Sequence, residues 1–452
     1  MKKIVEEKTQ LIGLVDADLM DNGTRHPNLA LLKIAGYLRD HKTPYELIIQ
    51  DAPDISRYRL IYMSRVFSFT QLPDFYVNCP KNKRNKLFKI GGTGWYMGAN
   101  QTSDFIKERQ KDVMRLENDP DLPGLNMRTQ MPDYHLYDEY VSQQINRGIK
   151  VSHYKDYLHY SIGFLTRGCF RKCSFCVNRY ETKSESYSNL EDFIDPKRPY
   201  IYLWDDNFFA APYRVWKPAL EALMSTGKPF QFRQGLDERM IAQSPHGEEM
   251  AQLLSKSKYH GDFIFAFDNW KDRPIIEKAL KIWKKYNPKK GTKFYLFCGY
   301  RQEKSNESLF YDDIFELFQR IKVLMQYRCV GYVMRHEDYH NAPIPNFYVQ
   351  IARWCNQQAF YKKMSFWEFC YRNQSYWEET SLKIKNGQKL ISFSDFEYQF
   401  DKGYYEGEKM KITRPLQTVL DVLNMFPKNK AELLEMFNYK MDELADSTLW
   451  NK

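Results

Sequence analysis

Six short apolar segments recur between residues 160 and 334, and this regular series restricts the fold more than any other feature of the sequence. The expected strands are Tyr160–Leu165, Tyr200–Trp204, Phe230–Arg233, Phe263–Phe267, Phe294–Phe297 and Val330–Met334. The stretches between them, such as 215–224 and 312–325, carry apolar residues at helical spacing. Strands that alternate with helices predict parallel pairing. Because a closed (β/α)8 barrel needs eight such units, we expect a partial (β/α)6 TIM-like barrel with functional residues at the carboxyl ends of its strands.

A second, smaller alternation precedes this series. Strand candidates occur at Gln10–Val15, Tyr45–Ile49, Leu60–Met63 and Leu87–Ile90, and a helical pattern begins after Asn28. We therefore predict four segments: a Rossmann-like parallel sheet domain in residues 1–100, a linker or lid in 101–157, the partial barrel in 158–345, and a helical C-terminal region in 346–452.

Composition excludes several classes of protein. Hydrophobic residues make up 43% and aromatic residues 16% of the 452 residues, as in a folded chain with a sizeable core. We find neither an apolar run of about 18 residues nor a secretory signal, so we expect a cytoplasmic protein without membrane association. The net charge of +10 is mild for this length, which makes nucleic acid a less favoured partner.

Three of the eight cysteines are close in sequence, directly after the first barrel strand. Cys169, Cys173 and Cys176 form a C-x3-C-x2-C pattern. Three thiolates on one loop can converge on a single metal centre and leave one coordination position open for chemistry. The alternative is a structural Cys3His zinc site completed by His153 or His159. Cys298, Cys329, Cys355 and Cys370 have no close-spaced partners, so we interpret them as small buried apolar residues.

The segment LTRGCFRKCSFCVNRYE resembles the signature of radical S-adenosylmethionine (radical SAM) enzymes, C-x3-C-x-Φ-C with Φ aromatic. The resemblance implies that the three cysteines ligate a 4Fe–4S cluster whose remaining iron binds S-adenosylmethionine. Reductive cleavage would then release a 5′-deoxyadenosyl radical that abstracts hydrogen from a substrate. Phe175 occupies the aromatic position of the motif and would pack near the adenine or the cluster.

The resemblance also places cofactor contacts at the ends of the later strands. Asp205, Asp206 and Asn207 stand where the family commonly binds the methionyl ammonium group, although the usual Gly-Gly-Glu is absent. Candidates for ribose, carboxylate, adenine or substrate contacts follow strands three to five: Arg233, Gln234, Asp237, Asp268 and Gly299. Each acid or arginine could instead cap a helix or form a surface ion pair. Their recurrence at successive strand ends favours the cofactor site.

Residues 10–98 resemble the cobalamin-binding domain that precedes many such enzymes. The D-x-H-x-x-G signature of the histidine ligand is missing after Asp16, so we expect the fold without a histidine-ligated cobalamin. A low-potential flavodoxin or ferredoxin would supply the electron.

The leading hypothesis is thus a radical SAM enzyme of unknown substrate. The alternatives are a non-catalytic zinc or iron–sulfur scaffold, and a radical SAM enzyme that modifies nucleic acid. The sequence identifies neither a residue that reacts with the substrate nor the oligomeric state.

Overall fold

The computed structural model describes residues 11–95, 119–372 and 413–450. The chain divides into two compact units. We call the first, residues 1–235 with 257–260, the N-terminal unit, and the second, residues 236–256 with 261–452, the C-terminal unit. The division falls inside the segment predicted as a single barrel.

A four-stranded parallel sheet lies at the start of the N-terminal unit. Its strand order is β2-β1-β3-β4, with Ile12 opposite Leu60 and Ile61 opposite Phe88. Both central strands are buried at every position, as their nearly continuous apolar sequences require in a parallel sheet covered on both faces. The strands are β1 (Ile12–Asp16), β2 (Tyr45–Leu47), β3 (Leu60–Ser64) and β4 (Phe88–Gly91).

Short helices connect these strands, and α2 is the longest of them. Asn28 caps α2 because its side-chain oxygen accepts a hydrogen bond from Leu31 N at 3.2 Å. Gly36 of α2 packs closely against the backbone of Met131, because a Cβ at this position would lie 2.0 Å from Met131 O. The helices are α1 (Ala17–Asn22), α2 (Leu29–Asp40), α3 (Asp74–Val77) and α4 (Lys81–Leu87).

The described part of the segment predicted as a linker or lid contributes to the core of the N-terminal unit. Leu122, Tyr137 and Val141 are buried in one cluster with side chains of β1, α2 and β5. This segment contains α6 (Asp138–Asn146) and α7 (Lys155–His159). Residues 101–118 lie outside the described residues.

A second parallel sheet of the N-terminal unit has the strand order β5-β8-β9. Its strands are β5 (Tyr160–Gly163), β8 (Tyr200–Leu203) and β9 (Phe230–Phe232), and α8 (Tyr213–Ser225) connects the last two. A two-stranded antiparallel ribbon, β6 (Thr166–Arg167) and β7 (Glu185–Ser186), follows β5.

The C-terminal unit is built around a three-stranded parallel sheet of order β10-β11-β12. The strands are β10 (Phe263–Ala266), β11 (Thr292–Cys298) and β12 (Val330–Arg335). The helices beside and between them are α9 (Arg239–Gln243), α10 (Gly247–Lys256), α11 (Arg273–Tyr286) and α12 (Glu307–Gln326).

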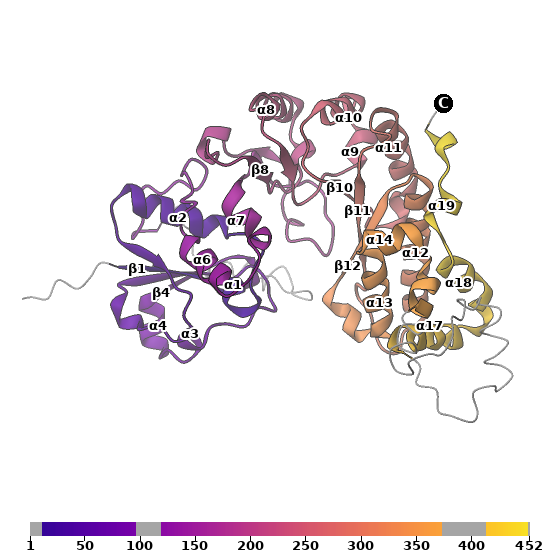
Figure 1. The fold of residues 1–452 in the computed structure, drawn as a ribbon, viewed down its shortest axis with the longest axis horizontal. Helices are drawn as coiled ribbons and strands as arrows, with labels where there is room; N and C mark the ends of the chain where they lie inside the picture. The colour runs from indigo at the N-terminus through magenta and orange to yellow at the C-terminus, as the bar shows by residue number, and fades with distance from the viewer. Residues whose placement is uncertain (1–10, 96–118, 373–412, 451–452) are drawn as a thin grey trace, which may run out of the picture. The chain divides into compact units, whose positions relative to one another are not determined.

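Further helices complete the C-terminal unit, where α13 contacts α17, and α12 contacts α18 and α19 (Figure 1). They are α13 (Pro345–Cys355), α14 (Gln358–Lys363), α17 (Arg414–Met425), α18 (Lys430–Phe437) and α19 (Met441–Leu444).

The structure confirms a mixed α/β protein with parallel sheets. All ten strands expected from the apolar pattern are present, with boundaries that differ by a few residues. Among the described residues, none of the helices combines the length and apolar character needed to cross a bilayer.

Candidate functional site

The three clustered cysteines lie on the loop between β6 and β7, just beyond the carboxyl end of β5. The antiparallel pairing of Thr166 with Ser186 closes the base of this loop. Gly168 is required there, because its φ is +95° and a Cβ would lie 2.2 Å from Lys183 O. We call residues 168–184 the cysteine loop.

Nitrogen atoms donate hydrogen bonds to the sulfur atoms of Cys169 and Cys176. Arg171 N donates to Cys169 Sγ at 3.3 Å, and Asn207 Nδ2 donates to the same sulfur at 3.4 Å. Asn178 N donates to Cys176 Sγ at 3.4 Å. Such N–H···S contacts stabilise thiolates and are typical of sulfur atoms that ligate iron.

The environment of Cys176 indicates that the three thiols are near one another. Burial raises the pKa of the Cys176 thiol, the Asn178 N–H opposes this effect, and the neighbouring Cys173 and Cys169 raise the pKa further. Cys169 is buried, whereas Cys173 and Cys176 are partly exposed. A bound cation would reverse this effect, because it favours deprotonated sulfur ligands.

Asp205, which follows β8, binds the start of the connection from β5. It is 1% exposed, and its carboxylate accepts hydrogen bonds from Leu165 N at 3.2 Å, Thr166 N at 2.6 Å and Thr166 Oγ1 at 2.7 Å. Burial raises the pKa of Asp205 to about 7, although these hydrogen bonds lower it. The side chain therefore positions the strand end from which the cysteine loop departs.

The next two residues continue this contact along the loop. Asp206 Oδ2 accepts a hydrogen bond from Gly168 N at 2.8 Å and forms an ion pair with Arg167 Nε at 3.2 Å. Asn207 then reaches Cys169, as described above. Asp205, Asp206 and Asn207 thus bind successive residues from 165 to 169, and we call them the loop clamp. A contact of the loop clamp with a methionyl ammonium group stays a prediction.

The remaining predicted residues of the N-terminal unit lie near the ends of β8 and β9. Arg233 forms an ion pair with Asp156 at 3.5 Å, and its guanidinium carbon lies 4.7 Å from the centre of the Tyr202 ring. Gln234 is exposed and lines a cavity. Phe175 is half-buried on the cysteine loop.

Three predicted residues belong to the C-terminal unit. Asp237 pairs with Arg239 at 2.7 Å. Burial raises the pKa of Asp268 to about 6, while Arg320 and Arg239 lower it. Gly299 has a φ of +74°, donates its N–H to Asp313 Oδ2 at 2.8 Å, and packs where a Cβ would lie 2.7 Å from Tyr339 Cβ. These contacts are internal to that unit.

In the described part of the chain, no three His, Cys, Asp or Glu side chains are drawn together as a preformed metal site. Whether the residues suit a metal cluster is therefore judged from the chemistry of the donor atoms, because the side chains are not already arranged around a common point. Three neighbouring cysteines and three N–H···S contacts suit a group held by thiolates. The residues present fit such a cluster in this respect.

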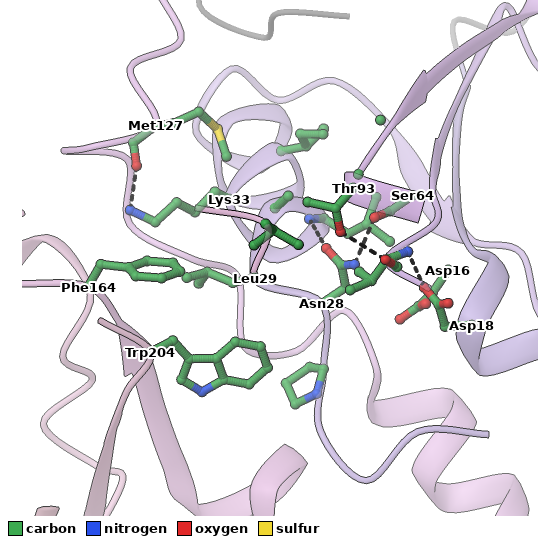
Figure 2. A pocket seen from close by; sticks show the side chains of 18 of the residues that line it. Asp16, Asp18, Asn28, Leu29, Lys33, Ser64, Thr93, Met127, Phe164 and Trp204 are labelled. Carbon is green, nitrogen blue, oxygen red and sulfur yellow. Dashed lines mark hydrogen bonds between the residues drawn. The ribbon is translucent and has the colours of Figure 1, made fainter. Parts of the chain in front are cut away.

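A cavity of about 810 Å³ adjoins the cysteine loop within the N-terminal unit. Its lining includes Asp206 from the loop clamp and Val177 and Asn178 from the loop. Other lining residues come from the carboxyl ends of β1, β3 and β4, among them Asp16, Ser64 and Gly91. Figure 2 shows Phe164 and Trp204 on one side of this cavity and Asn28, Ser64 and Thr93 on another.

Sequence reasoning did not identify Trp204, His26 or Asn28 as neighbours in one cavity. The rings of His26 and Trp204 meet edge to face, with centroids 4.6 Å apart. The available signal was the position of Asn28 at a helix start and of Trp204 at a strand end, since both places lie at carboxyl ends of parallel strands. Comparison with protein-family models and with curated proteins finds no match to this chain.

Proposed function

We propose that this protein is a radical SAM enzyme. The observation that carries the proposal is the place and surroundings of the C-x3-C-x-Φ-C motif: its cysteines lie on a loop directly beyond a parallel strand, with N–H donors on two sulfurs. Functional groups in folds built from βα units gather at this end of the strands. Cys169, Cys173 and Cys176 would hold the 4Fe–4S cluster.

When bound, the cluster would supply one electron, received from a flavodoxin or ferredoxin, for reductive cleavage of a carbon–sulfur bond of S-adenosylmethionine. The chain itself would orient the ligands. The loop clamp sets the course of residues 165–169, and Asn207 donates to Cys169 Sγ. Asp206 and Gln234, which line the cavity beside the loop, would contact S-adenosylmethionine.

The finer architecture is part of the same proposal. The parallel strands β5, β8, β9 and β10, β11, β12 follow one another in chain order, as the six strands of a partial (β/α)6 barrel would. The sheet of β1–β4 would be a Rossmann-like domain without a histidine-ligated cobalamin. The proposed location is the cytoplasm.

The test is anaerobic cleavage of S-adenosylmethionine. Protein reconstituted with iron and sulfide is reduced with dithionite, and 5′-deoxyadenosine is measured by chromatography. We expect product from the wild type and from Cys355→Ala, which alters a fully buried cysteine in α13, and none from Cys173→Ala. Equal product from both variants would contradict the assignment of the loop cysteines. A folded, iron-loaded wild type that forms no product would favour a non-catalytic scaffold.

A further inference from the structure

The cavity beside the cysteine loop lies at a topologically special place in the first sheet. In the order β2-β1-β3-β4, the chain passes from β1 to one neighbour and then returns to the other side at β3. Ligands of open parallel sheets bind outside the carboxyl ends of the strands at this switch point. Asp16 ends β1, Ser64 ends β3, and both residues line the cavity. Its volume of about 810 Å³ suits one small organic molecule.

One side of the cavity is aromatic. Phe164 and Trp204 (Figure 2) follow the carboxyl ends of β5 and β8. The His26 ring packs against Trp204. Burial lowers the pKa of His26 to about 4, so this imidazole is neutral near pH 7. Aromatic side chains stack on flat heterocycles and tolerate any base, because every base has a π-face.

Four of the charged side chains that line the cavity have hydrogen-bond or ion-pair partners within the protein. Asp16 accepts from Tyr137 OH at 2.8 Å, and Asp18 accepts from Val66 N at 2.7 Å. Lys33 donates to Met127 O at 2.7 Å (Figure 2). Lys89 forms ion pairs with two aspartates, Asp119 and Asp121. The charged side chains that line the cavity are five carboxylates and four cations, so the lining carries no excess of positive charge that would favour a phosphate: Asp16, Asp18, Glu181, Glu185 and Asp206, and Lys33, Lys89, Arg128 and Arg167.

Neutral polar groups lie between these charges. Asn28 Nδ2 donates to Ser64 Oγ at 2.8 Å, and Thr93 Oγ1 donates to Val66 O at 2.8 Å. Ser64 keeps a hydroxyl proton to donate, Asn28 a second amide proton, and Thr93 its acceptor lone pairs. Such groups match hydroxyl and amide functions on a ligand.

We propose that this cavity binds a neutral nucleoside, with the base against Phe164 and Trp204 and the sugar hydroxyls toward Asn28, Ser64 and Thr93. The residues proposed to contact the nucleoside are different from Asp206 and Gln234, which line the same cavity and are proposed to contact the cofactor, and none of them is a cysteine. The nucleoside comes either from solution or from a nucleic acid strand, and the experiment below distinguishes these sources.

Gly91 offers a direct way to fill the cavity. No heavy atom lies within 4 Å of the position that a Cβ on Gly91 would take, and this residue lines the cavity. A Cβ at this position therefore meets open space, and Gly91→Leu adds an apolar side chain to the lining of the cavity. Ala222→Leu, at an exposed position of α8, adds the same side chain elsewhere and is the matched control.

The experiment measures binding by isothermal titration calorimetry with full-length protein to which no iron has been added. The probes are adenosine, guanosine, cytidine and uridine, their 5′-monophosphates, and single-stranded RNA and DNA oligonucleotides. We expect at least one nucleoside to bind, its monophosphate to bind more weakly, and Gly91→Leu to weaken binding by about tenfold or more. Trp204→Leu, which removes one aromatic wall, should weaken it several-fold. Ala222→Leu and Cys173→Ala should bind as the wild type does.

Binding of oligonucleotides that Gly91→Leu weakens equally would identify a strand as the source, whereas binding of free nucleosides alone would identify a small molecule. The proposal fails if no nucleoside binds in either form, if the monophosphates bind more tightly, or if both cavity variants bind like the control. Displacement of the nucleoside by S-adenosylhomocysteine at similar concentration would show that the nucleoside occupies the cofactor site. That result would overturn the proposal. Nucleoside binding in a protein that does not cleave S-adenosylmethionine would contradict the proposed function alone.

Discussion

Two groups of cysteines in this chain occupy opposite environments. Cys169, Cys173 and Cys176 lie on a polar loop at strand ends, near one another and beside backbone and side-chain N–H donors. Cys298, Cys329, Cys355 and Cys370 are at most 1% exposed inside the C-terminal unit. Burial raises the pKa of Cys329 to about 12 and raises those of the other three as well. Placement on the fold thus separates ligand candidates from packing residues of the same chemical type.

The largest expected effect of this difference is on alkylation. Native protein treated with iodoacetamide should be modified at Cys173 and Cys176 first, because both are partly exposed. The four buried cysteines should react about 10³-fold more slowly or worse, since their reaction requires an opening that costs several kcal/mol. Peptide mass spectrometry over time measures both rates. Similar alkylation rates for the two groups of cysteines would contradict the difference in accessibility between them.

A second expected effect concerns the loop clamp and pH. The folded protein holds the proton of Asp205 up to about pH 7, whereas the unfolded chain releases it near the ordinary value of 3.8. Raising the pH from 5 to 7 should therefore lower the free energy of unfolding of the wild type by about 2 kcal/mol. Asp205→Asn should not show this decrease.

Urea unfolding at pH 5, 6 and 7 measures this difference. Asp268→Asn in the C-terminal unit is the comparison variant. The pH-dependent difference in unfolding free energy between this variant and the wild type should be smaller, because the pKa of Asp268 is raised only to about 6. If the free energies of unfolding of the wild type and Asp205→Asn differ by the same amount at all three pH values, the carboxyl group of Asp205 is ionised in the folded protein throughout this range.

The smallest expected effect is local loosening of the cysteine loop. Asp206→Ala removes the acceptor of Gly168 N and the ion pair with Arg167. The loss of about 1 kcal/mol should raise trypsin cleavage after Arg171, Lys172 or Arg179 about fivefold. Asp421→Ala, at an exposed position of α17, should leave these rates unchanged. Equal cleavage in both variants would show that the clamp does not hold the loop.

The sequence was sufficient to predict the strands and the position of the cysteines, because both depend on local patterns. Apolar runs such as Leu60–Met63 and Val330–Met334 are buried parallel strands in the structure. The burial of Cys298, Cys329, Cys355 and Cys370, predicted from their isolation in the sequence, is confirmed.

The partners of the loop clamp could not be predicted in the same way. Asp205 and Thr166 are 39 residues apart, and no local pattern indicates that their side chains meet. The cavity is a further case, because it combines residues of β1, α2, β3, β4, the cysteine loop and the end of β8. Which of these segments face each other is decided by packing of the whole N-terminal unit.

The most direct test of the account is the metal content of anaerobically reconstituted protein, measured together with acid-labile sulfide and Mössbauer spectra. We expect about four iron and four sulfide per chain, retained in Cys355→Ala and lost in Cys173→Ala. One zinc per chain and no iron, or an iron content that Cys173→Ala leaves unchanged, would contradict the assignment of Cys169, Cys173 and Cys176 as ligands of an iron–sulfur cluster.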